Sequence, residues 1–332
     1  MSRTFFFLLK PHKSSIIRHM GNYIVFDLEW NQGKKVKESN GKALPFEIIE
    51  IGAVRLDENR NRTGEFSRLI KPQVYKKMHK ITEDLIHITM EDLQDGDDFV
   101  TVIRDFLTWC GDDPTFCTWG PLDLTELQRN MDFFGLDLLS DRPLPFYDVQ
   151  KLFSIQYEDG KMRRSLEHAT ESLGMEKDSA FHRALSDADY TARIFCELDR
   201  KVFYNYSFDN YVTPKTKDQE VHIIFEHYAK YISREFKTKE ELLSDPEVMG
   251  TKCYLCNRPI RRKVKWFSLN GKHFYSVSLC KEHGYMKAKV RVKKTEHDRY
   301  YAVKTLKFIS EEDMTEMKKK SEKKKYKSKD ED

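Results

Sequence analysis

A short apolar run that ends in two acids constrains this chain more than any other feature. Residues 23–30 read YIVFDLEW, a continuous hydrophobic segment that favours a central strand buried on both faces. Asp27 and Glu29 are two residues apart, so in a strand both side chains point to one face while Leu28 points to the other. Two carboxylates this close repel each other unless they are protonated or bridged by cations. The run therefore favours an acidic site over a solvated strand end, because unpaired charge on a buried strand is costly.

The rest of the first 200 residues predicts strands first and alternating helices later. Further strands are expected at 46–56, 65–72, 115–120 and 144–149, of which the first two form a hairpin. Helices are expected at 98–110, 124–135, 165–174 and 182–198. This order predicts an α/β architecture in which helices flank a mixed sheet.

Three more polar residues fall where such a sheet would gather them. Asp123 directly follows a strand in TWGPLD, at a strand-to-helix junction of the kind where ligand sites lie. Asp187 lies on the expected helix 182–198, and His182, five residues earlier, cannot share its helical face. His182 must then lie at or before the helix start, directed over the same end of the sheet. Four carboxylates with one imidazole suit Mg²⁺ or Mn²⁺ rather than a thiol-seeking metal.

The ordered segments FDLEW, EIIEIGAV, ITMEDL, TWGPLD and HRALSD resemble the DEDDh 3′-to-5′ exonucleases over about residues 22–198. PFEIIEIGAV and SLEHATESLGM are similar to the histone-mRNA 3′ exonuclease branch and its bacterial KapD-type relatives. The resemblance implies a ribonuclease H-like fold and a two-metal mechanism that releases nucleoside 5′-monophosphates. Asp27, Glu29, Asp123 and Asp187 would hold two Mg²⁺ or Mn²⁺ ions, and His182 would be the general base. The expected preference for RNA over DNA rests only on the resemblance to the histone-mRNA branch.

Two departures from the family pattern suggest further contacts with nucleic acid. Trp30 follows the acid pair, where it either stacks on a terminal base or packs into the core, the commoner use of an aromatic ring. Residues 31–45 form a long connection that includes Lys34 and Lys35, and it is either a mobile flap contacting phosphates or a solvated loop. Trp30, Lys34 and Lys35 are therefore candidate nucleic-acid ligands.

Near the C-terminus, a CxxC and a CxxH predict a structural zinc site. The four ligands would be Cys253, Cys256, Cys280 and His283. Two strand-like runs around Asn270-Gly271 separate the pairs, and this dipeptide is a strong hairpin signal. Four protein ligands leave no open position for catalysis; the alternative is coincidental cysteines without metal. Cys110, Cys117 and Cys196 are interpreted as free thiols, which favours a reducing, cytoplasmic location.

Charge is divided unequally along the chain. Residues 251–332 contain 24 Lys and Arg against 11 Asp and Glu, a net of +13, which leaves −9 for residues 1–250 out of the total of +4. Aromatic residues at 266, 267, 274 and 275 lie beside a basic cluster, which combines phosphate neutralisation with stacking surfaces. The cluster predicts a nucleic-acid partner and consists of Arg258, Arg261, Arg262, Lys263 and Lys265.

These patterns predict five segments. They are a disordered arm or mis-assigned start at 1–20, with Met20 as a candidate initiator, an exonuclease domain at 21–200, a helical connector at 201–250, a small basic zinc-binding β-hairpin module at 251–310, and a disordered charged tail at 311–332. No apolar run approaches the ~20 residues that span a bilayer, so no membrane partner is expected. We expect a metal-dependent 3′-to-5′ exonuclease; the alternative is a catalytically silent adaptor with the same fold.

Overall fold

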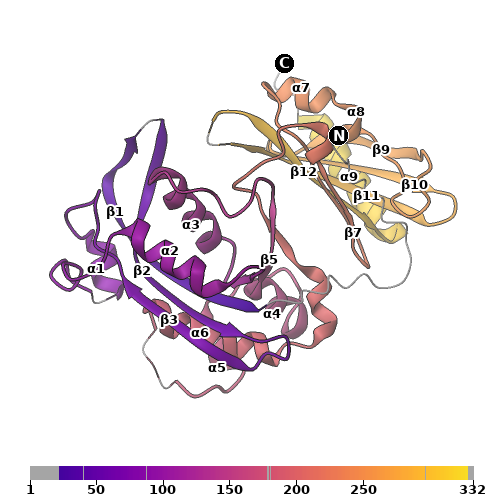
Figure 1. Ribbon diagram of the computed structural model, residues 1–332. Helices are drawn as coiled ribbons and strands as arrows, with labels where there is room; N and C mark the ends of the chain where they lie inside the picture. Colours follow the sequence, from indigo (N-terminus) through magenta and orange to yellow (C-terminus); the bar gives the residue numbers. More distant parts are fainter. Residues whose placement is uncertain are drawn as a thin grey trace, which may run out of the picture.

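The structure is a computed structural model that describes residues 22–327 except 40, 87, 178, 180 and 296. Its chain forms two lobes, each built on a six-stranded sheet (Figure 1). The arm expected at 1–20 and the last five residues of the charged tail lie outside the described part. Within that part, no helix is long and apolar enough to cross a membrane.

The first sheet has the strand order β3-β2-β1-β4-β5-β6. Its central strand β1 is antiparallel to β2 and parallel to β4, so the sheet is mixed as the sequence predicts. β4 is parallel to β5, whereas β3 and β6 are antiparallel edge strands. The strands are β1 (Tyr23–Ser39), β2 (Lys42–Leu56), β3 (Arg62–Leu69), β4 (Thr115–Thr118), β5 (Leu144–Asp148) and β6 (Ser207–Asp209).

Helices cover both faces of this sheet, which confirms the predicted fold class (Figure 1). One face packs against α2 (Phe99–Cys110) and α3 (Leu122–Phe133) around the fully buried Phe26 and Phe106. The other face packs against α4 (Val149–Tyr157), α5 (Leu166–Ser172) and α6 (Ala184–Glu197) around Val25 and Phe195. A short helix, α1 (Lys80–Ile86), lies beside β1.

The connection expected at 31–45 is a strand pair instead of a loop. β1 and β2 continue as a long hairpin that projects from the sheet, with Lys37 opposite Leu44 (Figure 1). The Tyr75 hydroxyl donates to the Leu44 carbonyl at 2.6 Å and accepts from the Lys37 N–H at 3.1 Å. The Tyr75 ring also lies over Gly33, where a Cβ atom would come within 2.4 Å of it. A tyrosine from outside the segment thus holds the hairpin together, and the local sequence does not reveal it.

Residues 201–250 are not the expected helical connector. They contain two short 3₁₀ turns, η1 (Arg200–Asn205) and η2 (Lys217–Gln219), then strands β7 (Val221–Ile224) and β8 (Ala229–Ile232), and finally the short helices α7 (Lys239–Ser244) and α8 (Pro246–Met249). β7 and β8 pair across a tight turn, in which the Phe225 N–H donates to the Tyr228 carbonyl at 2.8 Å. They bury Tyr231 against one face of the second sheet and Ile232 against the other.

The second sheet is antiparallel throughout, with the order β7-β8-β12-β11-β10-β9. Its other strands are β9 (Arg261–Ser268), β10 (His273–Cys280), β11 (Gly284–Lys294) and β12 (Tyr300–Phe308). The predicted hairpin is present between β9 and β10, with Gly271 at a φ of 68° in its turn. The segment after Cys280 is strand β11. The small module expected at 251–310 is therefore part of a larger sheet that includes residues 221–232.

The charged tail is helical over much of its length, contrary to the expected disorder. Helix α9 (Glu311–Lys327) begins after Ser310, whose hydroxyl accepts from the Asp313 N–H at 3.1 Å. Met314 and Met317, three residues apart, pack against the second sheet together with Val264 and Val277. This narrow apolar stripe is hidden in the lysine-rich composition, which is why the sequence suggested a disordered segment.

Gly52 determines how closely helix α6 approaches the first sheet. It lies on β2 opposite Asp27 of β1, and a Cβ atom there would lie 2.0 Å from the Leu185 nitrogen. Ala184 is fully buried at the same contact. The missing side chain lets the first turn of α6 rest directly on β2, which brings Asp187 over the end of β1.

We predict that Gly52→Ala displaces the start of α6. Overpacking of this kind costs about 1–3 kcal/mol of unfolding free energy, and nuclease activity should fall with it. Gly64→Ala is the matched control, because its Cβ would meet its nearest neighbour at an ordinary 3.4 Å. Urea unfolding of both variants checks this; equal stability of the two would contradict the contact.

Candidate active site

Three carboxylates from two elements converge at the end of β1. One oxygen atom each from Asp27, Glu29 and Asp187 lie within 4.8 Å of one another. Asp27 and Glu29 project from the same face of β1, as their spacing predicts, and Asp187 comes from the first turn of α6. The convergence depends on the strand alternation in β1 and on the close approach of α6 at Gly52.

Asp123 is next to this group but outside its tightest part. It lies in the first turn of α3 and is 6% exposed. The chain reaches it from β4 through Gly120, whose φ of 99° is a backbone conformation that other residues rarely adopt. The charge of Asp123 is the strongest of those that raise the Asp27 pKa, and a hydrogen bond from the Leu28 backbone reaches Asp123 itself. The four predicted carboxylates therefore share one site.

His182 lies immediately before α6, where the five-residue spacing predicts it. Its φ is 64°, a left-handed conformation that is uncommon for a residue with a side chain. Its backbone N–H donates to Asp187 Oδ2 at 3.3 Å, and its side chain is exposed. The other oxygen, Asp187 Oδ1, is buried and has no hydrogen-bond partner.

An ion pair between a buried glutamate and an exposed arginine borders this site and was not predicted from the sequence. Glu50 of β2 lies opposite Glu29 of β1 and is 1% exposed. The Arg183 guanidinium contacts its carboxylate through Nε at 3.2 Å and Nη2 at 2.8 Å, and the Ala184 N–H donates to it at 3.3 Å. Glu50 therefore anchors the residues between His182 and α6. The sequence feature that could have identified Glu50 is its position inside EIIEIGAV, one of the segments that resemble the exonuclease family.

Burial and crowding favour the protonated forms of all four carboxylates. The Asp27 pKa lies well above its usual range because of burial and then the charges of Asp123 and Glu29. Burial, with the charges of Asp187 and Glu50, raises the pKa of Glu29 to about 8. Burial raises the pKa of Asp123 to about 7 and that of Asp187 to about 6, despite hydrogen bonds that oppose the shift.

This site has the properties of a divalent-cation site. The group supplies hard oxygen donors, and one of them, Asp187 Oδ1, is buried without a partner. Cations placed among the carboxylates would remove the repulsion that raises their pKa values. The residues present therefore fit Mg²⁺ or Mn²⁺.

The other candidate nucleic-acid ligands of this lobe, Trp30, Lys34 and Lys35, differ in exposure. Trp30 is partly buried and packs on the core, with its ring centroid 5.5 Å from that of Phe46. Its position thus agrees with the packing alternative. Lys34 and Lys35 are exposed on the hairpin just beyond the acidic end of β1. They stay candidates for phosphate contacts.

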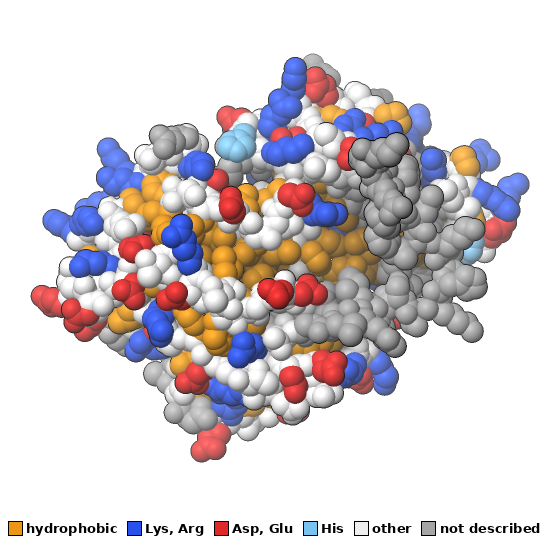
Figure 2. Space-filling model, viewed as in Figure 1, with side chains coloured by type: hydrophobic (Ala, Val, Ile, Leu, Met, Phe, Trp, Pro, Cys, Tyr) orange, Lys and Arg blue, Asp and Glu red, His pale blue; other side chains and the backbone are white. Residues whose placement is uncertain are grey.

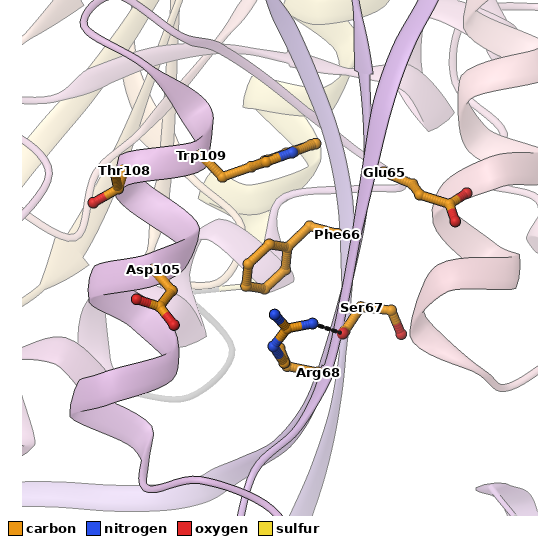
Figure 3. Close-up of a pocket in the computed structure, with 7 residues that line it drawn as sticks. All are labelled: Glu65, Phe66, Ser67, Arg68, Asp105, Thr108 and Trp109. Atoms are coloured by element: carbon orange, nitrogen blue, oxygen red, sulfur yellow. Dashed lines mark hydrogen bonds between the residues drawn. The ribbon is translucent and has the colours of Figure 1, made fainter.

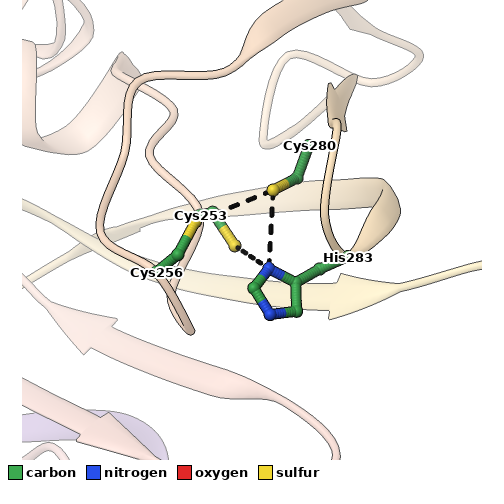
Figure 4. A group of neighbouring side chains, drawn as sticks. All are labelled: Cys253, Cys256, Cys280 and His283. Atoms are coloured by element: carbon green, nitrogen blue, oxygen red, sulfur yellow. Dashed lines mark hydrogen bonds between the residues drawn. The ribbon is translucent and has the colours of Figure 1, made fainter.

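The cysteine and histidine side chains form a second ligand-like group, in the second lobe (Figure 4). Cys256 Sγ lies 3.7 Å from Cys280 Sγ, and His283 Nδ1 lies 3.5 Å from the sulfurs of Cys253 and Cys280. A tetrahedral zinc ion has sulfur–sulfur and sulfur–nitrogen edges of about 3.8 and 3.6 Å from its usual bond lengths. The sulfurs are too far apart for a disulfide. The group fits a closed structural zinc site.

The predicted basic cluster lies next to these ligands. Arg261, Lys263 and Lys265 are exposed on β9, an edge strand of the second sheet. Arg262 is exposed there too, with Nη2 3.4 Å from the Met249 carbonyl, and Arg258 forms an ion pair with Glu282. The residues are grouped as the sequence predicts.

A surface depression between β3 and α2 is separate from both groups (Figure 3). Phe66 and Trp109 lie inside it, and the Arg68 guanidinium lies 5.3 Å from the Phe66 ring centroid. None of the predicted site residues lines it. The acidic group, and not this depression, is the candidate active site.

Comparison with known proteins yields one family match and several distant relatives. The profile of a family described as "Exonuclease" matches residues 24–195, just over half of the chain. A probable 3′-5′ exonuclease KapD from Bacillus subtilis (strain 168) is 28% identical over 160 residues, which is 45% of this chain and 71% of the relative. The DNA polymerase III subunit epsilon of Aquifex aeolicus (strain VF5) is 26% identical over 203 residues, 59% of this chain and 89% of the relative. A crystal structure of the nuclease domain of 3′hExo, a DEDDh family member bound to rAMP, has a TM-score of 0.46 at 19% identity, covering 55% of this chain and 96% of that one.

We predict that the metal-free protein loses stability as the pH rises from about 4 to about 8. Unfolded carboxyl groups titrate near 4, whereas the folded values are about 6 for Asp187, 7 for Asp123 and 8 for Glu29. In that window the folded state holds protons that the unfolded state has released, so the unfolding free energy falls with pH. Mn²⁺ added at pH 8 should reverse the loss, because it binds only the folded site.

Thermal unfolding at several pH values, with and without Mn²⁺, measures this effect. Asp27→Asn removes one raised carboxyl group and should flatten the pH dependence. A melting temperature that is constant from pH 5 to 8 and indifferent to Mn²⁺ would refute the interpretation.

Proposed function

We propose that this chain, which belongs to the exonuclease family and is a 3′-to-5′ exonuclease of the DEDDh type, releases nucleoside 5′-monophosphates from single-stranded or 3′-overhanging nucleic acid. The observation that carries the proposal is the convergence of Asp27, Glu29 and Asp187 oxygens within 4.8 Å, beside Asp123 and His182. For catalysis, the phosphodiester and the attacking water must both be bound next to these carboxylates.

The four carboxylates are proposed as the ligands of two Mg²⁺ or Mn²⁺ ions. Bound there, such ions supply charge stabilisation for the transferring phosphoryl group and activation of water near neutral pH. The chain contributes the positions of its oxygens, which β1, α3 and α6 fix independently. Glu50 and Arg183 maintain the approach of α6 and so act as positioning residues.

His182 is the proposed general base. Its backbone is tied to Asp187 while its imidazole is exposed beside the acidic group, so the ring is free to take a proton from the attacking water. The left-handed backbone at His182 supports this role, because strained residues of this kind are frequent at functional sites.

RNA is the proposed preferred substrate, on the strength of the sequence resemblance alone. Digestion of 5′-labelled single-stranded RNA, single-stranded DNA and an RNA hairpin, side by side with Mn²⁺, tests both the reaction and the preference. The proposal expects progressive shortening from the 3′ end and 5′-mononucleotide products, faster on RNA. Equal or faster digestion of DNA would contradict the proposed preference for RNA, but not the proposed 3′-to-5′ cleavage.

We predict that His182→Ala lowers kcat by about 10²- to 10⁴-fold with little change in KM.

Asp187→Asn should abolish cleavage while the fold is retained, because it removes both a ligand and a repelling charge. His168→Ala, an exposed histidine on α5 of the same lobe, is the matched control and should retain full activity. If His182→Ala changes only substrate affinity, or if Asp187→Asn keeps activity within a few-fold of the parent, the assigned roles are wrong.

The Cys253, Cys256, Cys280 and His283 group is proposed to bind one structural zinc ion. The spacings of 3.5 and 3.7 Å support it, as do two tight turns that present the ligands. The first turn closes with the Asn257 N–H donating to the Cys253 carbonyl at 2.7 Å. The second joins β10 to β11, with Gly284 at a φ of 86°.

We predict about one zinc ion per chain by elemental analysis. Cys256→Ser should lose the metal and open residues 250–285 to protease, whereas Cys196→Ser, a half-buried free cysteine of the first lobe, should retain it. Equal metal content in the two variants would contradict the site.

We also propose that residues 21–200 suffice for the chemistry and that residues 251–310 contact nucleic acid. For the second lobe the support is its excess of positive charge and the exposed basic residues of β9.

A further inference from the structure

The central strand of the second sheet presents a row of basic side chains on one face. Basic residues alternate along β11 with buried ones, and the row consists of Lys287, Lys289, Arg291 and Lys293. Residues two apart in a strand share a face and are about 7 Å apart, so the row extends for about 20 Å. Lys230 of β8 lies on the same face, because it pairs with Thr305, which pairs with Lys289. We call these five residues the β11 basic face.

The opposite face of the sheet is already packed. Val290 and Ala302 point to that side and are fully buried with Leu242 of α7 and Val248 of α8. Figure 1 shows α7 and α8 along this side of the sheet. The β11 basic face is covered in part, by Phe208 and Phe225 at one end and by Met317 of α9 at the other, and its middle is open to a ligand.

The two ends of the basic face are bounded by different parts of the chain. At one end α9 packs on the sheet through Met317, near Lys287. At the other end Lys230 Nζ lies 5.5 Å from the ring centroid of Phe208, next to the first lobe. Between them Lys289 and Arg291 are exposed. The open stretch thus connects the helical tail to the exonuclease lobe.

Carboxylates lie near the two ends of the basic face but do not pair with it directly. Asp209 acts electrostatically on Lys293, Asp148 on Lys230, and Asp313 and Glu316 of α9 on Lys287. In the described part of the chain, none of the five basic side chains forms an ion pair with an acidic residue. Three ammonium groups lie over aromatic rings instead: Lys230 over Phe208, Lys287 over Tyr275 at 5.6 Å, and Lys293 over Tyr301 at 5.4 Å. Burial, and then the charge of Lys293, lowers the pKa of Lys230 to about 8. A polyanion bound along the open middle would supply counter-charges to the exposed Lys289 and Arg291.

The end of the face that contains Lys230 lies near the carboxyl end of β5 in the first sheet. The Asp148 carboxylate acts electrostatically on Lys230, and Asp148 ends β5 opposite Thr118 of β4. β1, β4 and β5 are parallel, so their carboxyl ends lie at the same end of the sheet. Asp27 and Glu29 of β1 lie toward that end.

We propose that the β11 basic face binds the sugar-phosphate backbone of a single nucleic-acid strand whose 3′ end occupies the acidic site. The inference rests on the proposed nuclease function and adds where the rest of the substrate lies. Alternating cations beside aromatic rings suit phosphates and stacked bases together. This surface differs from the basic cluster of the edge strand β9. On the side of the molecule in Figure 2, charges of both signs are interspersed around a hydrophobic band, so basic residues do not dominate that view.

The test compares two pairs of exposed basic residues in the same lobe. Lys289→Gln with Arg291→Gln removes two charges from the basic face, and Lys318→Gln with Lys319→Gln removes two from the exposed side of α9. A third pair, Lys263→Gln with Lys265→Gln, examines the β9 cluster. Fluorescence anisotropy measures binding of an oligouridylate of about 20 nucleotides. All proteins carry Asp187→Asn, so that binding is read independently of hydrolysis.

For the Lys289/Arg291 pair, we expect the slope of log affinity against log salt to become shallower by about 1.4, since each lost phosphate contact contributes about 0.7. The affinity should fall by about 25-fold at 0.1 M salt. In the background with Asp187 intact, hydrolysis of a dinucleotide should stay within about twofold of the parent, because a dinucleotide is too short to reach the face. The α9 pair should leave the slope unchanged.

Two results would overturn the inference. One is a slope and affinity for the Lys289/Arg291 pair equal to those of the α9 pair. The other is a loss confined to the Lys263/Lys265 pair, which would assign the strand to the β9 cluster. Because binding is measured in a background without cleavage, neither result depends on whether the parent hydrolyses RNA.

Discussion

Mutual repulsion among half-buried carboxylates held close together is the constraint on which the rest of this structure depends. Asp27, Glu29 and Asp187 are held within 4.8 Å although burial and their own charges oppose it. A solvated loop would relax and separate them. Here a central strand fixes two of them, and a helix seated on Gly52 fixes the third. The fold thus stores an unfavourable charge arrangement that divalent cations are suited to relieve.

The surroundings of the site reinforce that arrangement. Glu50, the fifth carboxylate of the group, is neutralised by Arg183 and does not require a cation. The same arginine lies between His182 and α6, so one ion pair orients both the proposed base and the helix that carries Asp187. An acidic site of this kind repels a polyanionic substrate unless cations are bound. The basic residues on β9 and β11 of the second lobe are proposed to attract such a substrate, together with Lys34 and Lys35 of the first lobe.

Features encoded locally could be predicted from the sequence, and those fixed by distant contacts could not. The two-residue spacing of Asp27 and Glu29 and the five-residue offset of His182 from Asp187 determine their relative placement within one strand or one helix start. The mixed sheet followed from the order of the elements. The long β1–β2 hairpin depends on Tyr75, some 30 residues away, and strands β7 and β8 depend on pairing with β12. Glu50 was missed because its role depends on Arg183, 133 residues later.

The most direct measurement is a calorimetric titration of the metal-free protein with Mn²⁺ at pH 7, repeated in buffers of different ionisation enthalpy. Ions that enter a site whose carboxylates are protonated must displace protons, and the buffer dependence of the heat counts them. The account predicts two Mn²⁺ per chain in the acidic site with net proton release. Absence of Mn²⁺ binding, or binding without proton release that persists in Asp27→Asn, would contradict it.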